Sequence, residues 1–289
     1  MSDARASHTA VLVCQGRAAA NERVAPDRFA DPTALTLLRD EERELVRQVR
    51  EGTPPAGWRP RVEYEMVRGS AEILVPRTIA IDDAVRESPR DQVVILGAGL
   101  DGRAWRMTEL HDSETYEVDQ PASQRDKRER AVALGDRQPH FVPVEFGRDD
   151  LAATLEAAGH RAGLPTTWVW EGVVPYLTPD EVRSTLDEVA ARSAPGSRLI
   201  VNYQEASVGM NIGLAVIKAF TLVFRRASPW RNEPWRSTWT VEQMRDLLTT
   251  RGFRVIRDDD LLTLAAALTM KINQRGSLRN SRVAVAEKQ

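Results

Sequence analysis

The chain has 289 residues, a length that suits one large domain or a core with a cap, and that can bury a sizeable hydrophobic core. The formal net charge is −2 and charged residues make up 28%, which argues against a bulk nucleic-acid binder or a polybasic membrane protein. A single cysteine, Cys14, excludes an internal disulfide and a multi-cysteine metal site. We therefore expect Cys14 to be a small buried residue in a reduced, cytoplasmic setting. We also expect no bound metal. The N-terminus has no long apolar run before a cleavage site, so no signal peptide is expected.

Residues 1–90 are predicted to form a helical cap. Helix formers with apolar residues at helical spacing predict helices over residues 7–22, 31–51 and 62–87. Asp31-Pro32 is a typical helix start, with the aspartate as N-cap and the proline in the first turn. Pro76 lies inside the last of these segments, so we expect a break or kink there.

From residue 91 the pattern changes to short β-branched runs that alternate with helical stretches. Strands are predicted over residues 92–97, 115–119, 140–146, 166–172, 196–204, within 240–259 after a helix, and over 281–288. Alternating βα units indicate an α/β fold with a doubly wound, seven-stranded, mostly parallel sheet. The last two strands are expected to close one edge as a hairpin-like pair, and residues 91–289 form the core.

The stretch from about residue 204 to 239 interrupts this alternation. It contains the most apolar run of the chain, residues 210–224, and then three tryptophans. The run carries Lys218 and is shorter than the ~20 residues that a membrane span needs. Because the stretch is too long for an ordinary βα loop, we expect an insertion over the carboxyl edge of the sheet, where ligands bind in open α/β folds.

A glycine turn follows the first strand. Gly97, Ala98 and Gly99 are candidate ligand-binding residues, because glycines let backbone approach a ligand closely. Together with Gly102 they spell G-x-G-x-x-G, which fits a nicotinamide dinucleotide or S-adenosylmethionine. The absence of G-x-x-x-x-G-K-[ST] excludes a P-loop.

Three carboxylates follow at the ends of successive strands, Asp119, Glu145 and Glu171. Carboxyl ends of parallel strands meet at one edge of a sheet, so all three are expected on the ligand side. Such a row suits ribose hydroxyls, an amino group and a sulfonium, and suits a negatively charged pyrophosphate poorly because like charges repel. Asp119 alone does not discriminate, since a carboxylate there accepts ribose hydrogen bonds in either class.

The motifs GAGLD, EVDQP and EGxxxYL, in this order and at this spacing, closely resemble the leucine carboxyl methyltransferase family, in its bacterial branch of S-adenosylmethionine-dependent methyltransferases. The resemblance covers about residues 70–200 and extends more weakly to the N-terminus. It implies a Rossmann-like class I methyltransferase with S-adenosyl-L-methionine as cofactor, whose methyl group is displaced in line from the sulfonium.

The resemblance also implies residues for the methionine part of the cofactor. Arg77, before the first strand, is similar in place to the arginine that binds the methionine carboxylate. The turn at Gly97, Ala98 and Gly99 would contact the methionine part, and Glu171 is similar in place to the acid near the methionine amino group.

For the nucleoside, the resemblance gives Asp119 as the ribose ligand. Glu145 and Phe146 stand where the family usually has Asp-Leu beside the adenine, with a longer carboxylate arm and a larger apolar neighbour. Gly102 departs from the more usual threonine or serine, and this departure is what completes the nicotinamide-like glycine pattern.

The sequence does not identify the methyl acceptor or a catalytic base. A carboxylate acceptor needs no general base, whereas a phenol or alcohol does. Tyr176 and Tyr203, near the ends of the fourth and fifth strands, are weak candidates, and we favour ordinary packing as the explanation for both. His111, His140 and His160 are assigned no catalytic role.

Several functions remain open at this point. We prefer O-methylation of a carboxylate or hydroxyl of a small molecule, with methylation of a protein C-terminal carboxylate as the alternative. A non-catalytic S-adenosylmethionine-binding regulator is a second class, and an NAD(P)-dependent oxidoreductase is disfavoured by the helical segment before the glycine turn, the acidic row and the lack of a Tyr-x-x-x-Lys pair. No nucleic-acid or membrane partner is expected, and a homo-oligomer is left open.

Overall fold

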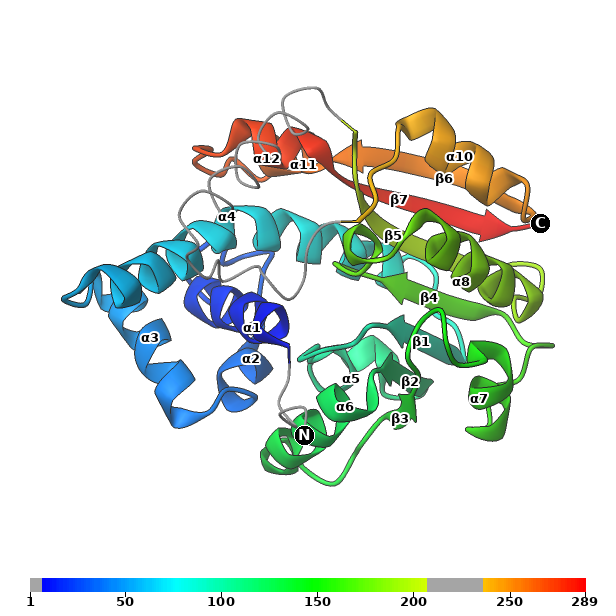
Figure 1. The fold of residues 1–289 in the computed structure, drawn as a ribbon, viewed down its shortest axis with the longest axis horizontal. Helices are drawn as coiled ribbons and strands as arrows, with labels where there is room; N and C mark the ends of the chain where they lie inside the picture. Colours follow the sequence, from blue (N-terminus) through cyan, green and yellow to red (C-terminus); the bar gives the residue numbers. More distant parts are fainter. Residues whose placement is uncertain (1–6, 207–235) are drawn as a thin grey trace.

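A single mixed sheet lies between two layers of helices in the computed structural model, which describes residues 7–206 and 236–289 (Figure 1). Its strands are β1 (Gln92–Leu96), β2 (Glu114–Asp119), β3 (His140–Pro143), β4 (Thr166–Trp170), β5 (Arg198–Gln204), β6 (Phe253–Asp260) and β7 (Ser281–Lys288). The order is β3-β2-β1-β4-β5-β7-β6, and β7 runs antiparallel to both neighbours while β1 to β5 pair in parallel. This confirms the predicted seven-stranded, doubly wound sheet and its hairpin-like closing pair.

Among the described residues, four helices precede the sheet and the other helices connect its strands. The first four are α1 (His8–Ala20), α2 (Pro32–Thr36), α3 (Asp40–Glu51) and α4 (Trp58–Arg86). The connecting helices are α5 (Arg103–Arg106), η1 (Thr108–Leu110), α6 (Pro121–Ala131), η2 (Val132–Leu134), α7 (Leu151–Ala157), η3 (Val174–Tyr176), α8 (Pro179–Ala191), α10 (Val241–Thr249), α11 (Leu261–Ala267) and α12 (Arg275–Asn280). Figure 1 shows α1 to α3 beside the carboxyl ends of the parallel strands, the side on which ligands are expected.

Alternation along the strands divides the core into two layers. In β1, Val94 and Leu96 face one side and pack with residues of α7, α8 and α10, whereas Val93 and Ile95 face the other side and pack with residues of α4, α11 and α12. Because both faces are covered, the central strands β1 and β4 are buried along their whole length. This double coverage leaves the carboxyl ends of the strands as the accessible edge for a site.

Helix α4 differs from the expectation in one respect. It begins at Trp58 and continues through Pro76, so of the predicted break or kink at Pro76 the break does not occur. A proline inside a helix costs about 3 kcal/mol because it removes a hydrogen bond and crowds the preceding turn. Val75 and Ile79 flank Pro76 and are buried in a cluster with Ala20 and Phe29, and this packing offsets the cost.

Helix α2 begins as the sequence predicts but ends at Thr36, so the helix predicted over residues 31–51 is divided into α2 and α3. Asp31 is its N-cap, and the side-chain Oδ1 accepts a hydrogen bond from the backbone N–H of Ala34 at 3.1 Å. Cys14 is fully buried under this helix, where its Sγ donates to the backbone carbonyl of Ala34. Burial raises the pKa of the Cys14 thiol to about 12, so Cys14 is the inert buried residue that we expected.

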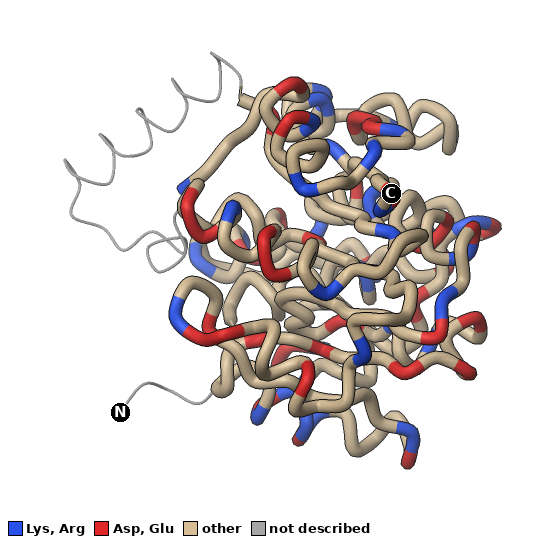
Figure 2. Tube along the Cα trace, turned by 90° about the vertical axis from the view of Figure 1, so that its right-hand side faces the viewer, with Lys and Arg blue, Asp and Glu red and all other residues tan. Residues whose placement is uncertain are grey.

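The predicted insertion falls almost entirely on residues 207–235, which lie outside the described residues. At its ends, Glu205 and Trp239 pair through an isolated parallel bridge, and Trp239 is buried. Within residues 7–206 and 236–289, no helix is long and apolar enough to span a membrane. Figure 2 shows that basic and acidic residues are interspersed along the side of the molecule in view.

Candidate active site

The glycine turn after β1 is a sharp backbone turn with two glycines in the left-handed region. Gly97 and Gly99 have φ angles of +67° and +48°, a region that other residues rarely adopt. A Cβ at position 97 would lie 2.2 Å from Cγ2 of Val173, and one at position 99 would lie 3.1 Å from Cβ of Ala10. Ala98 is buried, and its N–H donates to the carbonyl of Val118 in β2. The turn therefore presents backbone at the ligand edge.

Asp119 ties the end of β2 to this turn. Its Oδ2 accepts a hydrogen bond from the N–H of Gly99 at 2.6 Å, and its Oδ1 accepts one from Gln120 at 2.7 Å. Burial raises the pKa of Asp119, and the two backbone N–H donors partly counteract that shift. The structure thus brings together the glycine turn and the carboxylate that the sequence singled out for the ribose.

Arg77 and Glu171 meet on the other side of β1. Arg77 comes from α4 and Glu171 directly follows β4, and Nε of the arginine lies 2.8 Å from Oε1 of the carboxylate. Burial by itself would raise the pKa of Glu171, but the guanidinium groups of Arg103 and Arg77 hold it well below its ordinary value. The Nη atoms of Arg77 lie beside Gly172, where a Cβ would be 3.7 and 3.8 Å away.

The third carboxylate of the predicted row is placed differently. Glu145 follows β3 and pairs with Arg148 at 2.9 Å, and its side chain is 43% exposed. Phe146 packs against the hydrophobic layer under α7 and α8. The backbone directly after β3 still reaches the site edge, because the N–H of Val144 donates to the carbonyl of Asp119. The described contacts therefore join Asp119 to the glycine turn and Glu171 to Arg77, whereas Glu145 contacts neither pair.

Tyr203, one of the two weak catalytic candidates, is held by a hydrogen bond to another strand of the sheet. It is fully buried in β5, and its hydroxyl donates to Oδ2 of Asp258 in β6 at 2.7 Å. Burial and the Asp258 carboxylate raise the pKa of Tyr203 well above its ordinary value, so it is a poor general base. Tyr176, the other candidate, is the last residue of η3 after β4 and is partly buried.

Two of the histidines, His140 and His160, have structural partners. His140 contacts Glu114 at 2.7 Å between Nε2 and Oε2. His160 is buried against Tyr116 and Trp168, and burial together with Arg192 lowers its pKa to about 4. Neither contact lies at the carboxyl edge near Asp119 or Glu171.

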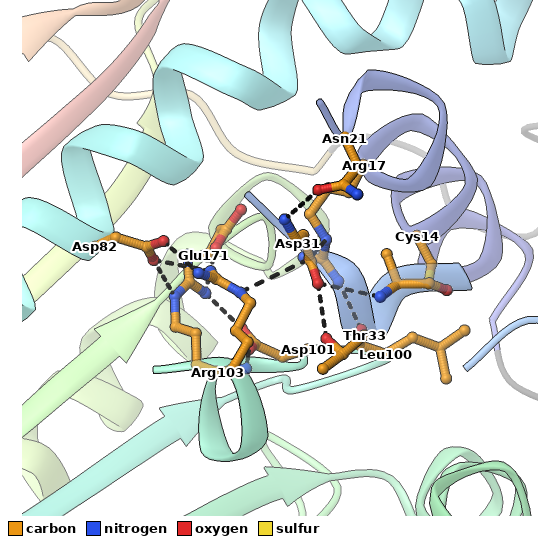
Figure 3. Close-up of polar contacts among 12 residues, drawn as sticks. Cys14, Arg17, Asn21, Asp31, Thr33, Asp82, Leu100, Asp101, Arg103 and Glu171 are labelled. Carbon is orange, nitrogen blue, oxygen red and sulfur yellow. Dashed lines mark hydrogen bonds and ion pairs between the residues drawn. The ribbon is translucent and has the colours of Figure 1, made fainter. Parts of the chain in front are cut away.

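A buried network of charges supports the site, and the sequence analysis missed it. Arg103 is fully buried and forms ion pairs with Asp82 at 2.7 Å, with Glu171 at 2.7 Å, and with Asp101. Figure 3 shows these three carboxylates pointing toward Arg103. The network continues from Asp82 to Arg106 at 2.6 Å. The signal in the sequence was the placement of charged residues inside an otherwise apolar region directly after the glycine turn.

Two cavities among the described residues lie away from this edge. One of about 240 Å³ surrounds the amino ends of β2 and β3, and one of about 160 Å³ lies between α4 and the β6-β7 pair. Neither is lined by Asp119, Arg77 or Glu171.

The residues at the carboxyl edge fit S-adenosylmethionine chemically. Arg77 offers guanidinium N–H groups for a carboxylate, Glu171 and Asp119 offer acceptors for an ammonium and for hydroxyls, and the turn offers bare backbone. Nη2 of Arg103 is buried and has no hydrogen-bond partner among the described residues, so this cluster has an unused donor.

A family model described as leucine carboxyl methyltransferase matches residues 10–190. The chain belongs to this family. A relative in Mycolicibacterium vanbaalenii is 34% identical over 211 residues, which cover 68% of this chain and 65% of the relative. A relative in Frankia alni is 37% identical over 202 residues, which cover 66% of each chain. Both carry the name "Putative S-adenosyl-L-methionine-dependent methyltransferase", and this chain matches about two thirds of their length.

Solved structures show the same fold at low sequence identity. A DUF574 family protein of Streptomyces avermitilis has a TM-score of 0.55 at 13% identity, with 98% of both chains covered. The magnesium protoporphyrin IX methyltransferase of Synechocystis, solved with bound SAH, has a TM-score of 0.51 at 15% identity, with 86% of this chain and 95% of the other covered. The comparisons confirm the predicted family and fold, and they agree with the predicted methyltransferase class and cofactor.

Proposed function

We propose that this leucine carboxyl methyltransferase family member transfers the methyl group of S-adenosylmethionine to an oxygen of a small molecule. The observation that carries the proposal is that two pairs of residues lie on either side of the carboxyl end of β1. In the first pair Asp119 is hydrogen-bonded to Gly99, and in the second Arg77 is paired with Glu171. The first pair suits a ribose and the second suits a zwitterionic amino acid, and S-adenosylmethionine contains both groups.

Each residue has a distinct part in this proposal. Asp119 accepts hydrogen bonds from ribose hydroxyls, and the Nη atoms of Arg77 bind the methionine carboxylate. Glu171 stays ionised between two guanidinium groups and accepts hydrogen bonds from the methionine ammonium. Glu145 and Phe146, after β3, lie on the adenine side of the site. The cofactor supplies the electrophilic methyl carbon, and the chain orients it toward the acceptor.

The contact of Tyr203 with Asp258 removes one of the two candidate bases, and this supports a carboxylate over a hydroxyl as acceptor. A carboxylate is already ionised at neutral pH and needs no base, whereas an alcohol must lose a proton. Tyr203 is tied to Asp258, and the histidines with described contacts lie elsewhere. We therefore place small carboxylic acids first among the acceptors, and hydroxyls second.

A labelling experiment tests the acceptor. The purified protein is incubated with S-adenosylmethionine that carries a tritiated methyl group and with a bacterial cell extract separated into small-molecule and protein fractions. We expect label in the small-molecule fraction, released as methanol by mild base, because methyl esters hydrolyse in base and methyl ethers do not. Base-stable label would count against a carboxylate acceptor, and base-labile label confined to protein would support the C-terminal carboxylate alternative instead.

A further inference from the structure

The N-terminal helices contact the glycine turn at three places. Ala10 of α1 fills the space beside Gly99, where a Cβ would be only 3.1 Å away. Thr33 of α2 fills the space beside Gly102, where a Cβ would lie 1.9 Å from the threonine Oγ1. Between them, the side chain of Leu100 is buried in the hydrophobic cluster of α1 and its neighbours. The outer side of the turn is therefore packed against α1 and α2.

Arg17 makes the polar contact between these helices and the turn. Its Nη2 donates to the backbone carbonyl of Leu100 at 2.6 Å, and its Nε lies 3.0 Å from Oδ2 of Asp31. The side chains of Arg17 and Asp31 are 5% and 1% exposed, and the Arg17–Asp31 pair is drawn in Figure 3. A buried arginine with two such partners is held rigidly, because breaking either contact leaves an unpaired buried group.

The same aspartate connects Arg17 to the charges of the site. Oδ2 of Asp31 also lies 3.8 Å from Nε of Arg106, and Arg106 pairs with Asp82, which in turn pairs with Arg103. Arg103 then reaches Glu171 at 2.7 Å. Buried ion pairs thus run without interruption from helix α1 to the carboxylate proposed for the methionine ammonium.

We propose that Arg17 is a positioning residue for the cofactor, a role that rests on the proposed function. It fixes the Leu100 carbonyl and so holds the turn in the conformation in which the backbone of Gly97 and Gly99 meets the ligand. A turn with two glycines at positive φ has much conformational freedom when unrestrained. Restraining it before binding removes an entropic cost from the binding free energy.

Binding measurements on variants test this role. The probe is S-adenosylhomocysteine, titrated calorimetrically into the full chain. Arg17→Met combined with Asp31→Asn removes both charges together, and the asparagine keeps the Oδ1 that caps α2. We expect this double variant to raise the Kd at least tenfold. Arg17→Lys keeps the charge but cannot bridge both partners with two nitrogens, so we expect a rise of roughly threefold to tenfold.

Arg28→Met is the matched control, because Arg28 also pairs with an aspartate, Asp83, but both side chains are exposed. We expect it to leave the Kd unchanged. A purely structural role for Arg17 would lower the unfolding temperature of Arg17→Lys without changing its Kd, and that result would overturn the proposal. Absence of binding to the unmodified chain would instead contradict the proposed function itself.

Discussion

Arg77 and Glu171 are 94 residues apart in the chain, yet Nε of one lies 2.8 Å from Oε1 of the other at the carboxyl end of β4. Each is nearly buried, and Glu171 has a second guanidinium partner in Arg103. A carboxylate held between two arginines stays ionised, and an arginine whose Nε is used keeps its Nη atoms for a second anion. The pair therefore offers one charge of each sign to a zwitterionic ligand.

Replacing the carboxylate of this pair should destabilise the fold. Glu171→Gln leaves Arg77 and Arg103 buried without one counter-charge, and we expect a loss of about 3–5 kcal/mol in the free energy of unfolding at pH 7. Denaturant unfolding measures the change. Glu65→Gln, which removes an exposed carboxylate paired with Arg61 and Arg68, is the control and should change little.

The loss of stability in Glu171→Gln should also depend on pH. The folded-state pKa of Glu171 is depressed, so its stabilisation is present above the unfolded pKa of about 4.5 and disappears as the pH falls toward the folded value. The difference between unmodified chain and Glu171→Gln should shrink in acid. A difference that is constant from pH 7 to pH 3 would contradict the ion-pair account.

Gly102 should matter for packing against α2. Its φ of −108° is open to any residue, so only the space occupied by Thr33 requires a glycine here. We expect Gly102→Ala to cost roughly 1–3 kcal/mol of stability, because the added methyl group overlaps Oγ1 of Thr33. Thr33→Ala in the same chain should recover part of that loss, and a double-mutant cycle measures the coupling. Strictly additive effects would show that the two positions do not compete for space.

Glu117 should make the stability of the fold depend on pH in the direction opposite to that of Glu171. It is buried in β2 beside Lys127 of α6, and burial raises the pKa of Glu117 to about 7 despite the lysine. A raised folded-state pKa contributes stability that is complete below the unfolded pKa of about 4.5 and is lost as the pH rises through about 7. The stability of the unmodified chain relative to Glu117→Gln should therefore fall between these values.

Urea unfolding at a series of pH values checks this, with Glu63→Gln as the exposed control on α4. Equal pH profiles for the unmodified chain and Glu117→Gln would show that Glu117 has an ordinary pKa.

Much of the fold could be predicted from local sequence patterns, because those patterns determine where the helices and strands form. Alternating βα periodicity gave the doubly wound sheet, and the glycines and Asp119 lie together because strand ends in parallel register meet at one edge. The continuity of α4 through Pro76 was not predictable, since it depends on burial against Phe29 and Ala20, which are distant in sequence.

The supporting charges were harder to predict than the ligand residues. Arg17 lies on α1, Asp31 caps α2 and Asp82 lies on α4, and their connection to Arg103 follows from how those helices pack on the sheet. Helical spacing says which residues share a face but not which faces meet. Gly102 completes a sequence pattern typical of a nicotinamide site, but the close approach of Thr33 gives the glycine a packing cause instead.

A calorimetric titration with S-adenosylmethionine, S-adenosylhomocysteine, NAD and NADP tests the central claim most directly. We predict that the two sulfur nucleotides bind, that NAD and NADP do not, and that Asp119→Ala abolishes binding while the exposed control Asp136→Ala retains it. A ligand at 100 times its Kd should also stabilise the fold by about 2.7 kcal/mol. Binding of NAD or NADP, or binding of S-adenosylmethionine that is unchanged in Asp119→Ala, would contradict the account.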